Sequence, residues 1–151
     1  MPVLVHIDLT ASTTSNNAIK SWIPELGLHP EDKVCLTKGK WLTDNIINAA
    51  QRLLKTTHFH IGGLHDTLLG ETLSFEIQHG EFVQILNVSQ SHWITVSNVG
   101  CEKGVVNIYD SIPSCYVPTR MKEQIAAILF ASEKTSNIRI QVQQGSNGCA
   151  R

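Results

Sequence analysis

The stretch that decides the fold runs from residue 81 to residue 110 and reads EFVQILNVSQSHWITVSNVGCEKGVVNIYD. It contains three strand-like runs, at 81–88, 93–99 and 105–109, with turn material between them. Because both connections are short, we expect these runs to pair as a meander of antiparallel strands.

A helix is predicted before this stretch, over residues 42–55. Its apolar residues recur at helical spacing, and Thr43 or Asp44 can cap its start. The recurring residues are Ile46, Ala49, Ala50, Leu53 and Leu54. We expect this helix to pack near the strands.

A second helix and a further strand are predicted after the stretch. Pro118 suits a first helical turn, and one apolar stripe continues from it through Ala131. Its members are Met121, Ile125, Ile128 and Leu129. Alternating apolar residues at Ile138, Ile140 and Val142 then indicate a half-buried strand. The order of helix, sheet, helix and strand is typical of an α+β domain.

Length and composition favour a single globular domain. The chain has 151 residues, of which 42% are hydrophobic and 17% charged. Residues 1–35 carry little pattern, apart from a weak strand signal at 2–9, so the readable domain is 36–151. The net charge of −1 gives no basic field for nucleic acid, which argues against that class of partner.

Because the sequence shows no recognisable targeting signal, we expect an intracellular protein of the nucleus or cytoplasm. The amino terminus lacks a basic leader, and no apolar run approaches the length that crosses a bilayer, so no membrane partner is expected. The four cysteines (35, 101, 115 and 149) have no short paired spacing, so reduced thiols are expected.

Two of the candidate chemical residues lie at strand ends. His92 comes immediately before one predicted strand, and Asp110 comes directly after the next. If these strands pair antiparallel, the start of one lies beside the end of the other, so His92 and Asp110 share one edge of the sheet. A histidine oriented by an acid is the base that a thiol nucleophile requires.

Cys149 is the candidate nucleophile. It follows a Gly/Ser/Asn turn after the last predicted strand, a place where a helix can begin, and a helix N-terminus favours a thiolate. Gln143 lies on the opposite face from the apolar residues of that strand and can donate to a developing oxyanion. The adjacent Gln144 is an alternative donor.

Four segments, in order, resemble the SUMO (sentrin) and other ubiquitin-like-protein proteases, whose papain-like fold implies a central, mainly antiparallel sheet flanked by helices. Residues 41–48 (WLTDNIIN) resemble the family's helix start, and His92-Trp93 resembles its catalytic histidine-tryptophan pair. Residues 108–112 (IYDSI) resemble the aspartate motif, and 143–149 the glutamine-to-cysteine segment. The similarity runs from about residue 36 to residue 149.

The resemblance implies a cysteine-type peptidase or isopeptidase that cleaves after the Gly-Gly end of a ubiquitin-like protein or its conjugates, without a metal or organic cofactor. It implies Cys149 as nucleophile, His92 as general base, Asp110 as the residue orienting it, and Gln143 as oxyanion donor. It further implies that Trp41 and Trp93 enclose a narrow channel for the Gly-Gly tail and that Asp44 contacts the substrate. Only glycines let a backbone thread so close to two indoles.

The sequence also departs from the family pattern. Gly148 and Ala150 stand where the family has Asp and Gly, and the chain stops two residues after Cys149. We therefore expect a truncated member, and an inactive module that binds a ubiquitin-like tail is the alternative function. An acyltransferase with a similar His/acid/Cys arrangement is a third. The histidines at 58, 60 and 65 lack a structural-zinc pattern, so we expect no metal.

Overall fold

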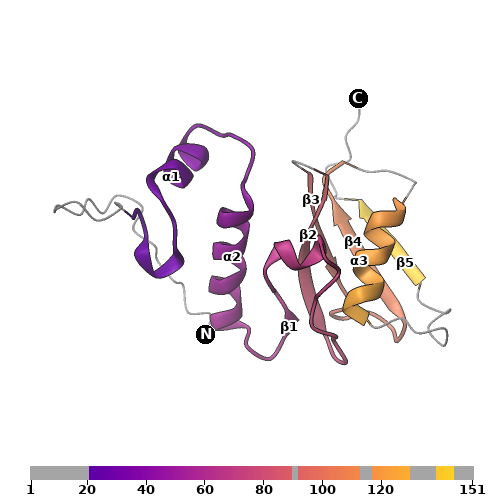
Figure 1. Ribbon diagram of the computed structural model, residues 1–151. Helices are drawn as coiled ribbons and strands as arrows, with labels where there is room; N and C mark the ends of the chain where they lie inside the picture. Colours follow the sequence, from indigo (N-terminus) through magenta and orange to yellow (C-terminus); the bar gives the residue numbers. More distant parts are fainter. Residues whose placement is uncertain (1–20, 90–91, 113–116, 130–138, 145–151) are drawn as a thin grey trace.

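The computed structural model describes residues 21–89, 92–112, 117–129 and 139–144. This part of the chain forms an α+β fold with three α-helices and a five-stranded mixed sheet (Figure 1). The elements in chain order are η1 (Pro24–Leu26), α1 (Pro30–Thr37), α2 (Asp44–Thr57), β1 (Gly62–Gly63), η2 (Thr67–Gly70), β2 (Phe82–Ser89), β3 (His92–Ser97), β4 (Val105–Asp110), α3 (Thr119–Leu129) and β5 (Arg139–Gln144).

The strands lie in the order β1-β2-β3-β4-β5, so chain neighbours are also neighbours in the sheet. The predicted meander is confirmed, because β2 pairs antiparallel with β3 and β3 with β4. The two outer pairs are parallel, however, so the expectation of a mainly antiparallel sheet is wrong. Helix α3 is the physical reason for the parallel pairing of β4 with β5. It carries the chain back along the sheet, so β5 starts in the same direction as β4.

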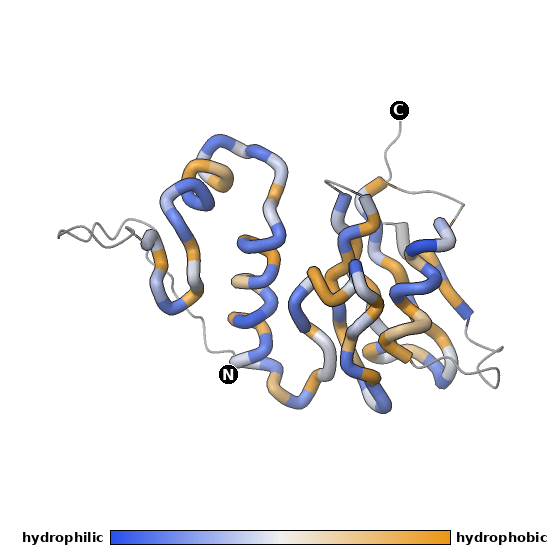
Figure 2. The backbone as a smooth tube through the Cα atoms, in the orientation of Figure 1, coloured by the Kyte–Doolittle hydropathy of each residue, from blue (hydrophilic) through white to orange (hydrophobic). Residues whose placement is uncertain are grey.

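The main hydrophobic core lies between the sheet and α3, which covers one face of the sheet (Figure 1). Alternate residues of the central strands point to this face, and the apolar stripe of α3 meets them. Figure 2 shows hydrophobic residues interspersed with hydrophilic ones along the strands. The buried members of this core are Phe75, Phe82, Leu86, Ile94, Val96, Val106, Ile108, Met121, Ile125 and Ile128.

Helix α2 packs differently from the sequence prediction. Ile46 and Ala49 of the predicted stripe are buried, but Ala50 and Leu54 are exposed, whereas the polar Asn48 and Gln51 are buried. The reason is that α2 has neighbours on two sides (Figure 1). Ile46 and Ala49 pack toward α1, whereas Asn48 and Gln51 form hydrogen bonds to the elements on the other side.

The contact between α2 and the sheet is a network of buried amide groups. Gln51 Oε1 accepts hydrogen bonds from the backbone N–H of Ile85 at 3.2 Å and from Gln84 Nε2 at 3.1 Å. Gln84 Nε2 also donates to Ile85 O, and Gln84 Oε1 accepts from His65 N, both at 2.9 Å. Since β1 pairs with β2 only at Phe82 and Val83, these amides satisfy the edge of β2 beyond the end of β1.

The N-terminal elements pack against the other side of α2. Leu28 and Cys35 form a second buried cluster with Ile46 and Ala49 of α2. The buried carboxylate of Asp32 accepts a hydrogen bond from Asn45 Nδ2 at 2.7 Å, which ties α1 to the start of α2. The expected boundary between residues 35 and 36 falls inside α1.

Candidate functional site

The structure brings His92 and Asp110 together at one edge of the sheet. His92 is the first residue of β3 and Asp110 the last of β4. The register pairs Thr95 with Tyr109, and continuing it by one residue sets Asp110 opposite Ile94. Since alternate residues share a face, His92, Ile94 and Asp110 all lie on the core-facing side of the sheet. The predicted geometry is therefore confirmed.

The two side chains form a direct hydrogen-bonded pair. His92 Nε2 lies 2.8 Å from Asp110 Oδ1, and the side chains are 23% and 10% exposed, respectively. The backbone N–H of Ile112 donates to the same carboxylate oxygen at 2.8 Å. Asp110 is thus fixed by the turn after β4 and can orient the imidazole, with the Nδ1 atom on the far side of the ring.

Trp41 and Trp93 lie on separate segments that meet beside this edge. Trp93 follows His92 on β3, and its Nε1 donates a 3.0 Å hydrogen bond to the carbonyl of Leu42. Trp41 is the neighbour of Leu42 in the loop between α1 and α2, and its side chain is mostly exposed, at 77%. Asp44 is the first residue of α2 and is half-buried.

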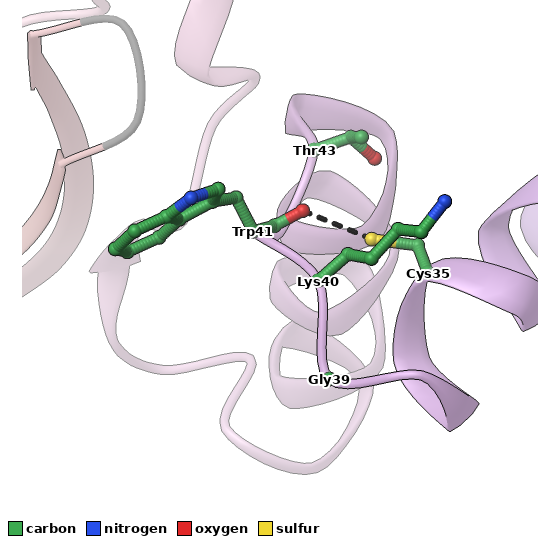
Figure 3. A pocket seen from close by; sticks show the side chains of 5 residues that line it. All are labelled: Cys35, Gly39, Lys40, Trp41 and Thr43. Carbon is green, nitrogen blue, oxygen red and sulfur yellow. Dashed lines mark hydrogen bonds between the residues drawn. The ribbon is translucent and has the colours of Figure 1, made fainter.

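A pocket of about 740 Å³ lies behind the Trp41 loop. Its lining consists of Cys35, Gly39, Lys40, Trp41 and Thr43 (Figure 3). Neither His92 nor Asp110 lines it. Figure 3 shows the Trp41 carbonyl pointing toward Cys35 and the indole pointing away from it.

The last described strand leads to the same edge as the His92–Asp110 pair. Gln143 lies on β5 opposite Tyr109, and Gln144 lies opposite Asp110. The side chains of these two glutamines and the whole of Cys149 lie outside what the structure describes. The predicted oxyanion donor is therefore located by its backbone position only.

The histidines at 58, 60 and 65 do not converge. The rings of His58 and His60 contact each other edge to face with centroids 6.3 Å apart. His65 instead lies with Nε2 3.7 Å from Glu76 Oε2. Within the described ranges, no group of three or more His, Cys, Asp or Glu side chains is arranged to hold a metal ion.

Two contacts of this region were missed by sequence reasoning. They are the bond from Trp93 to the Leu42 carbonyl and the bond from the Cys35 thiol to the Trp41 carbonyl, 2.9 Å long. Both acceptors are backbone atoms, so residue type carries no signal for them. Only the tertiary arrangement of α1, the loop and β3 creates them.

None of the helices in the described ranges has the length and apolar character needed to span a membrane. In comparisons with protein-family models, with curated proteins and with solved structures, nothing matches this chain.

Proposed function

We propose that this chain is a cysteine-type peptidase of the ubiquitin-like-protein protease type, with a papain-like arrangement of its sheet and helices. Its substrate is a ubiquitin-like protein, free or conjugated, cleaved after the Gly-Gly end. The observation that carries the proposal is the 2.8 Å contact between His92 Nε2 and Asp110 Oδ1 at the edge of the sheet.

The position of β5 supports Cys149 as the nucleophile. Gln144, the last residue of β5, pairs with Asp110 in a parallel ladder, so the two strands end at the same edge. Cys149 follows five residues later, and five residues span at most about 18 Å. The chain is therefore long enough to bring the thiol to the imidazole.

In the proposed reaction His92 acts first as a base and then as an acid. His92 takes the thiol proton of Cys149 through Nδ1, since Nε2 is engaged by Asp110. The thiolate attacks the carbonyl carbon of the terminal glycine, and an amide of Gln143 or Gln144 donates to the oxyanion. The C–N bond breaks as the imidazolium gives its proton to the leaving amine. Water activated by the same imidazole then hydrolyses the thioester.

The test uses ubiquitin-like proteins that end in Gly-Gly and carry a C-terminal electrophile. We expect wild-type protein to form a covalent adduct that peptide mass spectrometry maps to Cys149. Cys149→Ala should form none. His92→Ala should react at least about 100-fold more slowly, since it removes the proposed general base. Asp110→Asn should lose less, because the base remains and only its orientation and charge balance change.

Two matched variants control for general effects of substitution. His79 is an exposed histidine, so His79→Ala should react at the wild-type rate. Cys101→Ala removes a half-exposed thiol at the opposite end of the β3–β4 hairpin and should also leave the rate unchanged. An adduct on Cys101, or an unchanged rate in His92→Ala, would refute the proposed triad. Tight binding of the Gly-Gly tail without any adduct would favour the binding module.

A further inference from the structure

The loop between α1 and α2 is held by two side chains at consecutive carbonyl groups. The thiol of Cys35, on α1, donates to the Trp41 carbonyl at 2.9 Å. The indole N–H of Trp93, on β3, donates to the next carbonyl, that of Leu42, at 3.0 Å. One short segment is therefore attached both to the N-terminal helix and to the sheet that carries His92.

The Cys35 anchor is itself fixed by its surroundings. Cys35 is only 7% exposed and packs in the cluster with Leu28, Ile46 and Ala49. Its own carbonyl accepts a 3.0 Å hydrogen bond from the backbone N–H of Lys40. Cys35 thus contacts the loop through both its backbone and its side chain.

The side chain of Trp41 needs such an anchor because it has little packing of its own. It is 77% exposed, and Figure 3 shows the indole pointing to the side of the loop opposite the Cys35 contact. A large side chain in this state can change rotamer, so the direction of its Cα–Cβ bond, which the backbone sets, is what the structure can hold in advance. Holding the carbonyl on one side therefore restrains the direction in which the indole leaves on the other.

We propose that Cys35 is a positioning residue for substrate, which presets Trp41 by holding the backbone of its loop together with Trp93. The inference rests on the proposed function, in which Trp41 contacts the Gly-Gly tail. Cys35 touches neither the tail nor the reacting atoms. Losing one modest hydrogen bond that orders the loop should weaken tail binding by about threefold to tenfold, with the chemical step unchanged.

The first measurement tests the anchor in the free protein and requires no substrate. Protein labelled with 5-fluorotryptophan should give separate fluorine resonances for Trp22, Trp41 and Trp93. In Cys35→Ala, which removes the donor, the Trp41 resonance should narrow, because the released loop moves more freely. Cys35→Ser keeps a donor at the same position and should preserve the wild-type resonance.

Two further variants separate the anchor from a general loss of structure. Trp93→Phe keeps an aromatic ring without the N–H donor, and should release Trp41 from the other side. Cys101→Ala removes a thiol that lies 3.7 Å from the Val99 carbonyl at the far end of the hairpin, and should leave Trp41 unchanged. An unaltered Trp41 resonance in Cys35→Ala would overturn the proposal.

The second measurement tests the consequence for substrate. In a Cys149→Ala background, Cys35→Ala should raise the Kd for a ubiquitin-like protein ending in Gly-Gly threefold to tenfold. Cys35→Ser should restore the Kd of the protein with Cys35 intact. With Cys149 present, the labelling rate at saturating probe should stay constant. A released Trp41 with unchanged tail affinity would overturn the positioning role. If wild-type protein binds no Gly-Gly tail, the proposed function fails, and the fluorine spectra still decide whether Cys35 holds the loop.

Discussion

The buried glutamines between α2 and the sheet permit a prediction whose magnitude follows from a count of orphaned groups. The Val83 carbonyl accepts a hydrogen bond from the backbone N–H of Leu64, so it faces the β1 side of β2. The backbone groups of every second residue along β2 face the same side. Two residues on, the N–H and C=O of Ile85 face that side, where none of the described strands pairs with them. Gln51 accepts from the N–H and Gln84 donates to the C=O.

Replacing either glutamine by leucine keeps the volume and removes the partner. Gln51→Leu orphans one backbone group, the N–H of Ile85. Gln84→Leu orphans two, the C=O of Ile85 and the N–H of His65. A buried polar group without a partner costs about 1–3 kcal/mol, so we expect losses of about 1–3 and about 2–6 kcal/mol in the free energy of unfolding.

Equilibrium unfolding in urea measures both losses on the same scale. Gln141→Leu is the matched control, because Gln141 is an exposed residue of β5 and its loss should stay within about 0.5 kcal/mol. The reasoning is refuted if Gln51→Leu is as stable as this control. It is equally refuted if Gln84→Leu is the milder of the two buried changes.

Two further predictions concern stability. Burial, together with the cation of Lys55, lowers the pKa of His65 below its ordinary 6.5, against an opposing effect of Glu76. The unfolded chain then binds this proton more readily, so stability should fall as pH drops below 6.5, and urea unfolding at several pH values should show a smaller fall in His65→Gln than in wild type. Gly63 has φ +77° and an added Cβ would lie 2.2 Å from Val83 O, so Gly63→Ala should lower the unfolding midpoint in urea by an amount equivalent to at least about 1 kcal/mol. Gly80→Ala is the control and should leave the midpoint unchanged, because a Cβ there meets nothing within 4 Å. Equal losses of stability in the two variants would contradict the argument.

The parts of the fold that depend on local pattern were predictable from sequence. Apolar runs separated by short turns defined β2, β3 and β4, and the stripe ending near Leu129 defined α3. The parallel direction of β5 was not predicted, although the helix between β4 and β5 contains that information.

Helix α2 shows why the remaining packing could not be predicted. Helical periodicity marks apolar residues as buried and polar residues as exposed, yet Asn48 and Gln51 are buried and Leu54 is exposed. Burying an amide side chain is favourable only where it finds hydrogen-bond partners, which here are the backbone groups on the edge of β2. That edge exists because β1 is two residues long, a property of the assembled sheet rather than of any local segment.

The candidate site was predictable to the same extent and for the same reason. His92 and Asp110 could be placed together because a hairpin converts sequence spacing into register, and register into a shared edge. The environment of Trp41 could not be predicted from the sequence. It depends on hydrogen bonds that a thiol and an indole, on two distant elements, donate to backbone carbonyls.

The segments that lead to this edge reach it by three different routes, and that difference matters for how the site is built. His92 and Asp110 belong to one antiparallel hairpin, so the imidazole and the carboxylate stay in register as long as that hairpin persists. Gln144 arrives through the parallel pairing of β5 with β4, which follows α3 and depends on the core beneath it. The Trp41 loop arrives from the opposite side, through α1 and α2. The proposed base and its acid are therefore built on local contacts, whereas the segments that would add the nucleophile and the substrate wall depend on two separate hydrophobic clusters of the described residues.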